Sequence, residues 1–540
     1  MKKLLRSVGA AIAGFLLIFV SIQAKAGHTL WSDLTYSCVS PGVYVVQLKV
    51  YRDCAALGMP ATVPVNVKAP GCNTGRSIAM QRLPNSRIGN MYCASLPSAC
   101  SSTGRFNFEE VVYSGMVTFS AAEQSCANWV LSWTECCRPN LANIVNGSSE
   151  SMYAEAHLML APGLNNNSPL FGSIVSNLVA YNEPVQLSNY AIDMDGDSLV
   201  YSIQNPLNAN NSQISYANFP NVVIYNSDST KFSGISGPYS NAFPIFTYTI
   251  DWSQPMPLFP VKNFTLNSKN GSFKFIPRQF VQNQTPYSGV NRYALVTQVD
   301  EYRKINGVAT KIGSVRRDMF LEVVDAAGNK NPAVITQTAN GHAISESDVI
   351  NLRPGIPLNF QCSTSDGNAG DVITLTTDAS DILQGAVFTK TSTNNPTGTI
   401  TWTPTAAHIR GQVYYFHVLV ADNACPVKGH QIHTFGVKVT ANGSVTGSPE
   451  KFAGPVSFSA FPNPFSEEIT FNVNSETKAE SIVIYNLLGQ KVDEISLKTP
   501  GLGEQKVSYK NAGKHAAGTY VARLISGNKT LQTIKFTKLQ

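Results

Sequence analysis

The chain has 540 residues, 43% of them hydrophobic and only 14% charged, and its formal net charge at pH 7 is +6. At about 150 residues per domain, this length predicts three to four domains. Four of the 40 basic residues lie within residues 1–26, which leaves 40 − 4 = 36 against 34 acidic residues, and this near balance excludes nucleic acid as the expected partner because its binding needs a concentrated basic face.

The N-terminal segment, residues 1–26, has the pattern of a secretory signal peptide. Lys2, Lys3 and Arg6 come before the apolar residues 8–22, and a small-residue site ends at Ala26, after which we expect cleavage. The apolar stretch is shorter than the roughly 20 residues that a membrane-spanning helix needs, and no later stretch is long enough. The mature chain is therefore expected to be exported and to have no transmembrane segment.

Residues 27–165 are predicted to form a cysteine-rich β domain. An even number of cysteines in an exported chain indicates disulfide bonds, whose pairing stays open here. Cys136 and Cys137 are neighbours, and we expect each to have a separate partner because a direct bond between adjacent residues is strained. The eight cysteines of this domain are Cys38, Cys54, Cys72, Cys93, Cys100, Cys126, Cys136 and Cys137.

Short strands dominate the pattern of the whole chain. Residues 43–51 and 435–439 alternate apolar and polar side chains between clusters of Gly, Asn, Pro and Ser, as strands with one buried face do. One capping-box pattern, from Ser120 to Glu123, predicts a short helix. We therefore expect an all-β protein built of β-sandwiches.

The middle of the chain contains an internal repeat. Residues 184–187 and 197–201 parallel residues 357–360 and 371–375. Later parallels have a smaller offset, which places an insertion near residues 205–260 of the first copy. The repeat predicts two tandem Ig-like or cadherin-like β-sandwich modules, over residues 176–326 and 341–441.

Three carboxylates lie at alternate positions of one turn in the first copy: Asp193, Asp195 and Asp197. An oxygen-rich turn of this kind can bind Ca²⁺, and similar turns stand at the junctions of cadherin-like repeats. Asp and Gly are also favoured in turns for backbone reasons alone. A structural calcium site and an unliganded turn therefore both stay open, and no other cofactor is expected. Asp366 and Asp371 are the matching positions in the second copy, where the turn is longer.

Two further pairings are predicted inside the modules. Cys362 and Cys425 are the only two cysteines after residue 137, and we predict a disulfide bond between them. The basic pair at 316–317 is predicted to form cross-strand salt bridges with the acidic pair at 300–301.

After a linker at residues 442–456, the chain ends in four blocks: FPNPF at 461–465, IVIYNLLGQKV at 482–492, AAGTYVARL at 516–524 and LQTIKFTKL at 531–539. In this order they resemble the type A sorting domain of the type IX secretion system. The resemblance implies a β-sandwich sorting domain over residues 457–540, the secretion machinery as a partner, and export to the outer cell surface or the medium. The motif positions are Pro462, Asn463, Pro464, Gly489, Gly518 and Tyr520.

Residues 28–440 resemble large surface proteins associated with gliding motility and adhesion in bacteria that carry this system. The segments that carry the resemblance include DMDGDSLVYSI at 193–203, TWTP at 401–404 and DNACP at 422–426. It implies an adhesive or structural surface protein, with a surface glycan or protein as its ligand and no enzymatic reaction. Tyr414 and Tyr415 are candidates for a sugar-binding face, although core packing is the more frequent fate of strand aromatics.

The competing hypothesis is a secreted hydrolase of polysaccharide or protein that carries the sandwiches as accessory modules. No sequence motif of a metalloprotease, serine hydrolase or nucleotide-binding enzyme is present. Paired catalytic carboxylates have no characteristic spacing in a sequence, so a glycosidase of this type stays open. A deep cleft in which carboxylates converge would favour the enzyme, and flat faces with module junctions would favour the adhesin.

Overall fold

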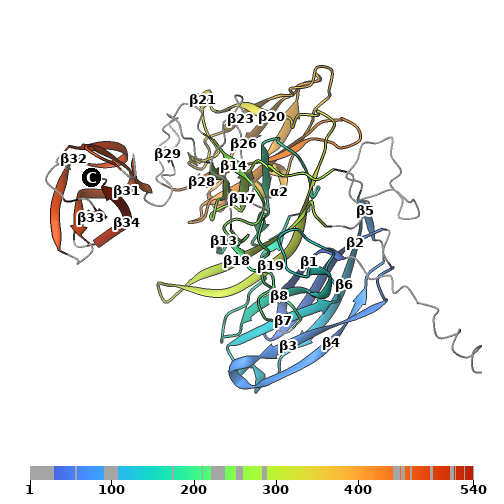
Figure 1. Cartoon of the computed structure of the whole chain (residues 1–540). Helices are drawn as coiled ribbons and strands as arrows, with labels where there is room; N and C mark the ends of the chain where they lie inside the picture. Colours follow the sequence, from blue (N-terminus) through green and yellow to red (C-terminus); the bar gives the residue numbers. More distant parts are fainter. Residues whose placement is uncertain are drawn as a thin grey trace, which may run out of the picture.

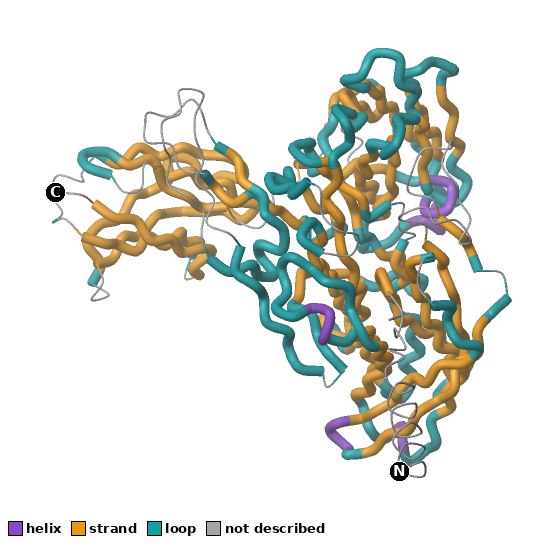
Figure 2. Tube along the Cα trace, turned by 45° about the vertical axis from the view of Figure 1, so that its right-hand side comes forward, coloured by secondary structure: helices purple, strands orange, loops and turns teal. Residues whose placement is uncertain are grey.

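The computed structural model describes residues 29–54, 57–84, 86–89, 108–172, 176–209, 211–219, 237–250, 260–282, 289–441, 450–451, 457–461, 465–486, 490–510, 516, 518–527 and 529–538. Strands make up most of this part of the chain, and Figure 2 shows helix only in short purple segments. The all-β fold class is confirmed. Ala26, Cys93 and Cys100 lie outside the described residues, as do Pro462, Asn463, Pro464 and Gly489.

The N-terminal strands close into a ring, drawn in blue and cyan in Figure 1. The long strand β19 closes the ring. Its residues Gly313 to Val315 pair with residues 156–158 at one end of the strand series, and its residues Arg317 and Asp318 pair with residues 32–33 at the other end. In ladder order the ring is β1 (Thr29–Ser40), β2 (Val43–Asp53), β6 (Phe108–Thr118), β4 (Thr74–Arg82), β3 (Thr62–Ala69), β7 (Asn128–Glu135), β8 (Met152–Met159) and β19 (Val308–Val324), and β5 (Arg87–Gly89) pairs with β6.

Strand β19 belongs to both of the ranges that were predicted as separate domains, 27–165 and 176–326. Its residues 313–318 pair with the ring, and its last residues, 322–324, pair with β10 (Leu178–Ala180). The two ranges therefore share one sheet. Local sequence patterns indicate that 308–324 is a strand but carry no information about which distant strands it joins.

The two predicted modules share most of their strand pairing. The first has β13 (Ser198–Gln204), β18 (Arg292–Ile305), β19 and β10 in one sheet and β11 (Val185–Ser188), β17 (Ser272–Phe275) and β16 (Phe264–Leu266) in another. The second has β24 (Thr374–Thr377), β27 (Tyr414–Ala421), β28 (His430–Val439) and β22 (Asp348–Leu352) facing β20 (Ala333–Ala339), β23 (Leu358–Ser365), β26 (Thr397–Trp402) and β25 (Val387–Lys390). In each, one pair is parallel: β10 with β19 and β22 with β28.

The remaining elements are short. Two of them lie in or directly after the segment predicted as an insertion, where aromatic side chains such as Phe219 and Phe243 join the core of the first module. These two are β14 (Tyr248–Thr249) and β15 (Val261–Lys262). The other short elements are β9 (Leu170–Phe171), β12 (Ala191–Ile192), β21 (His342–Ala343), β29 (Glu450–Lys451), α2 (Ala379–Ile382) and the 3₁₀ turns Pro70–Cys72, Glu123–Ser125, Gly147–Ser149 and Ala406–His408.

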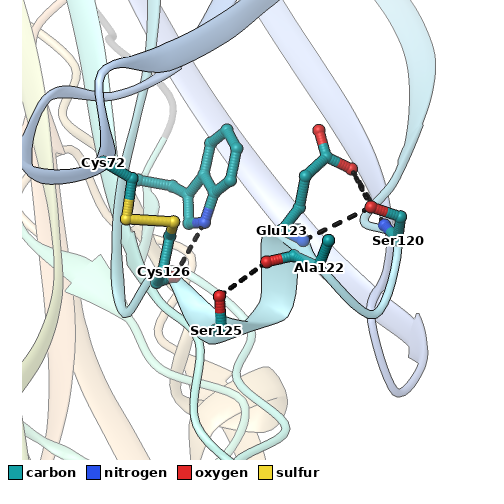
Figure 3. The surroundings of a disulfide bond; sticks show 7 residues. Cys72, Ser120, Ala122, Glu123, Ser125 and Cys126 are labelled. Carbon is teal, nitrogen blue, oxygen red and sulfur yellow. Dashed lines mark hydrogen bonds between the residues drawn. A yellow bond between two sulfur atoms is a disulfide. The ribbon is translucent and has the colours of Figure 1, made fainter.

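A disulfide bond joins Cys72 to Cys126 beside the predicted helix start. Figure 3 shows the reciprocal contacts of the capping box: the hydroxyl of Ser120 accepts from the backbone N–H of Glu123, whose carboxylate accepts from the backbone N–H of Ser120. The helix that follows is a single 3₁₀ turn, Glu123–Ser125.

Two of the predictions about cysteines are wrong. Cys136 and Cys137 are bonded to each other rather than to separate partners. Cys362 is a free thiol, whereas Cys425 is disulfide-bonded, so the predicted pair does not form. The side chain of Cys362 faces the sandwich core, where burial raises the pKa of its thiol to about 11. Cys54 is also disulfide-bonded and Cys38 is a free thiol.

The C-terminal strands form a sheet and a core of their own, drawn in red in Figure 1. Gly518 begins β33, and the nearby Tyr520 is buried and donates a hydrogen bond to the carbonyl oxygen of Ala516 at 2.7 Å. None of the helices in the described part of the chain is long and apolar enough to cross a membrane. The strands are β30 (Ser457–Phe461), β31 (Ile469–Asn486), β32 (Lys491–Tyr509), β33 (Gly518–Ser526) and β34 (Lys529–Lys538).

Candidate functional site

A cavity of about 420 Å³ lies at the junction of the two modules. The first module contributes residues 190–201, the turn into β13, together with residues 269–270 before β17. The second module contributes residues 381–382 from α2 and residues 410–417, which enter β27. Both modules therefore contribute to the lining of the cavity.

The cavity has an aromatic and a charged wall. Tyr415 is half-buried there, and burial raises the pKa of its hydroxyl to about 12. The Arg410 guanidinium lies over the Tyr414 ring, 3.4 Å from its centroid, and donates to the carbonyl oxygen of Val413. Burial lowers the pKa of Arg410, with Tyr414 and Asp193 opposing that effect. Further polar side chains of the lining are Ser198, Lys269, Asn270, Asp381 and Gln412.

A stacked pair forms another part of the lining. The rings of Tyr190 and His417 lie 3.5 Å apart, one from each module. The Asp378 carboxylate holds His417, with 2.7 Å between Oδ2 and Nδ1 and 2.6 Å between Oδ1 and the backbone nitrogen. This contact fixes the position of the histidine ring against the first module.

Polar and apolar contacts hold the two modules together beside the cavity. The Gln186 side chain on β11 donates to the Glu346 carboxylate and to the carbonyl oxygen of Ile432 on β28. Burial alone would raise the pKa of Glu346, but the hydrogen bond and charge of His433 lower it to about 2. The side chain of Ile432 also belongs to the hydrophobic core of the first module. The junction of the two modules is thus held by both polar and apolar contacts.

The acidic turn predicted as a calcium site meets a guanidinium group. Arg303 on β18 donates to both oxygens of Asp197, with 2.8 Å between Nε and Oδ1, and lies 3.2 Å from Asp195 Oδ2. Asp193 Oδ1 accepts the backbone N–H groups of Asp195 and Asp197. The sequence of the turn could not predict Arg303 as a partner, because Arg303 is 106 residues away from Asp197 in the chain. Calcium binding at this turn stays a prediction.

Glu301 lies beneath this turn and was not identified from the sequence as one of its ligand-type side chains. It is 0% exposed, lies close to Asp193 and Asp197, and accepts a hydrogen bond from the Asn166 side chain at 2.7 Å. Burial, followed by the hydrogen bond and charge of Asp193, raises the pKa of Glu301 to about 10. This shift favours the protonated form of the Glu301 carboxyl group.

We predict that Glu301→Gln stabilises the protein at neutral pH. The folded-state pKa of Glu301, about 10, lies above its unfolded value of about 4.3. The contribution of Glu301 to the free energy of unfolding is therefore complete below about pH 4 and is lost as the pH rises to about 10. The loss is at most about 1.4 kcal/mol per pH unit. Chemical denaturation at several pH values would show a flatter profile for the variant, and identical profiles would contradict the protonated state.

The predicted salt bridges between 316–317 and 300–301 are not formed. Asp300 pairs with Lys311, and the Arg316 guanidinium lies 3.5 Å from the Glu155 carboxylate. Arg317 binds Asp33 on β1, across the closure of the ring. The strand register explains this, because Arg316 and Arg317 pair with residues 298 and 297, whereas residues 300 and 301 pair with 314 and 313.

Comparison with known proteins identifies the C-terminal part. Residues 459–538 match the family model described as "Secretion system C-terminal sorting domain". The domain marks the chain as a substrate of the type IX secretion system that is exported to the cell surface or secreted. No curated protein matches the chain.

Similarity to solved structures is low. The N-terminal four Ig domains of Dscam1 isoform 6.44 align with 95% of this chain and 99% of that chain at 10% identity and a TM-score of 0.16. The endo-fucoidan hydrolase MfFcnA4 from glycoside hydrolase family 107 aligns with 66% of this chain and 39% of that chain at 13% identity and a TM-score of 0.13. The sialic acid binding region of the Streptococcus Sanguinis SK1 adhesin aligns with 51% and 78% at 13% identity and a TM-score of 0.15. Scores this low support no conclusion about function.

Proposed function

We propose that this exported protein is an adhesin that binds an oligosaccharide in the cavity at the junction of its two modules. The observation that carries the proposal is the composition of the cavity lining, which combines tyrosine rings with carboxylate, amide and cationic side chains. Its volume of about 420 Å³ lies in the range of small-molecule sites, roughly 300–1,000 Å³.

Each kind of group has a role toward a sugar. The apolar face of a sugar ring can stack on Tyr415, while its hydroxyl groups need the donors and acceptors that Asp381, Gln412 and Lys269 offer. The packed interface between the modules holds the two walls in fixed positions, which lowers the entropy cost of binding. Surface attachment of this kind would also serve gliding, the role that the resemblance of residues 28–440 implies.

A glycan array probed with the mature chain tests the proposal. We expect binding to a subset of oligosaccharides, and we expect Tyr415→Ala to weaken it by about tenfold or more, which corresponds to about 1.4 kcal/mol. Tyr181→Ala is the matched control, because Tyr181 is 39% exposed and lies outside the cavity lining.

Two outcomes would contradict the proposal. Equal binding by wild type and Tyr415→Ala would mean that the oligosaccharide does not bind in the cavity. Recovery of shortened oligosaccharides from the bound fraction would favour the alternative function, a secreted hydrolase.

A further inference from the structure

The internal repeat places a trio of carboxylates at the same register positions in both modules. In the first module Asp197 precedes β13, and Glu301 on β18 pairs with Leu199 of β13. In the second module Asp371 precedes β24, and Asp422 directly follows Ala421, which pairs with Thr374 of β24. The trios are Asp193, Asp197 and Glu301 in one copy and Asp366, Asp371 and Asp422 in the other, each with one ligand atom per residue within 4.8 Å of the others.

A linker asparagine reaches the same carboxylate in both copies. Asn166, which precedes the first module, donates from Nδ2 to Glu301 at 2.7 Å. Asn329, in the linker between the modules, donates from Nδ2 to Asp422 at 2.9 Å. Both asparagines are buried, with 0% and 8% of their surface exposed. The equivalence of the two sites therefore extends beyond the carboxylates.

The two sites differ in their positive charge. In the first, Arg303 supplies it, since its guanidinium binds Asp197 and donates to Asn166 Oδ1 at 2.9 Å. Counting from the β24 to β27 pairing, Ala424 occupies the position of Arg303 in the second module. Within the described residues, no Lys, Arg or His forms a salt bridge with Asp366, Asp371 or Asp422.

The substitution leaves one buried oxygen atom without a partner in the second site. Asn329 Oδ1, the counterpart of the atom that Arg303 satisfies in the first module, is buried and accepts no hydrogen bond. Asp366 Oδ2 is also buried and unpartnered, but so is the matching Asp193 Oδ2 in the first site, so Asn329 Oδ1 is the atom that distinguishes the two sites. Buried polar atoms normally have a partner, so a missing positive group is indicated here.

We propose that Asp366, Asp371, Asp422 and Asn329 bind a calcium ion at the place that the Arg303 guanidinium occupies in the first module. Carboxylate and carboxamide oxygens are the ligands that Ca²⁺ prefers. The ion ties the linker residue Asn329 to the two loops that flank β24 and β27, and so it stiffens the connection between the modules. This proposal is independent of the oligosaccharide site.

The test uses the mature chain after dialysis against a chelator. Isothermal titration with CaCl₂ alone should show saturable binding with a Kd on the order of 10⁻⁴–10⁻³ M, the range of extracellular calcium modules. Calcium at about 10 mM, well above that Kd, should raise the melting temperature by several degrees. Ala424→Arg should abolish both effects and should itself raise the melting temperature in chelator, because the new guanidinium takes the place of the ion.

A second pair of variants separates loss of the ion from loss of the fold. Asp371→Asn keeps the shape of a ligand side chain while it removes the charge, and it should lose calcium binding with a chelator melting temperature close to that of wild type. Asp300→Asn, outside the trio, should bind calcium as wild type does. The proposal is overturned if wild type neither binds nor is stabilised by calcium, or if Asp371→Asn and Ala424→Arg both retain binding.

Discussion

Replacing Arg317 with methionine should lower the free energy of unfolding by about 3–5 kcal/mol. The Arg317 side chain is 1% exposed, and its guanidinium donates to the Asp33 carboxylate, with 2.7 Å between Nε and Oδ1. The substitution removes one partner and leaves the other charge buried without compensation. Because Asp33 and Arg317 are paired residues of β1 and β19, the loss falls on the strand pair that closes the ring.

Urea denaturation followed by tryptophan fluorescence measures this loss, since Trp31 is buried on β1. Arg87→Met is the matched control, because the side chain of Arg87 is 51% exposed and its salt bridge with Glu110 should contribute less than about 1 kcal/mol. The double variant Asp33→Asn with Arg317→Met should recover part of the loss, because it removes the unpaired charge. A similar loss for Arg317→Met and Arg87→Met would mean that the ion pair does not hold the ring closed.

Local patterns were sufficient to predict many of the strands. Alternation of apolar and polar side chains over 43–51 and 435–439 corresponds to β2 and β28, because the two faces of a strand have different surroundings. Repeated turn and strand segments at 184–187 and 357–360 correspond to β11 and β23 in equivalent sheets. Both kinds of signal lie within a few neighbouring residues.

Long-range pairings could not be predicted in the same way. The closure of the ring joins Asp33 to Arg317, which are 284 residues apart, and the Cys362 thiol is free because its strand turns that side chain into the sandwich core. The local sequence around these residues does not identify which distant residues they contact. The predicted pair of Cys362 and Cys425 rested on the even number of cysteines alone.

The acidic sites show the same limit of local sequence patterns for functional residues. Asp193, Asp195 and Asp197 could be recognised as a group because they lie in one turn, whereas Glu301 and Arg303 come from β18. In the second copy the sequence identified Asp366 and Asp371, but Asp422 and Asn329 join them only through the strand register and the linker. A repeat aligned through strand pairing would have found all of these residues.

Deletion of residues 457–540 should abolish surface export. Strands β30 to β34 have a sheet and a hydrophobic core of their own, so the preceding chain should still fold when they are removed. The predicted signal peptide should carry the truncated chain across the inner membrane, and without a sorting domain this chain should accumulate in the periplasm. Immunoblots of the periplasmic fraction should show the truncated chain in an amount comparable to that of the exported full-length protein.

The most direct measurement labels intact cells with a membrane-impermeant reagent and compares the full chain, the truncated chain and a periplasmic reporter fused to residues 457–540. We expect the full chain and the fused reporter to be labelled, and the truncated chain to be labelled only after the outer membrane is opened. Labelling of the truncated chain on intact cells, at the level of the full chain, would contradict export through the C-terminal domain.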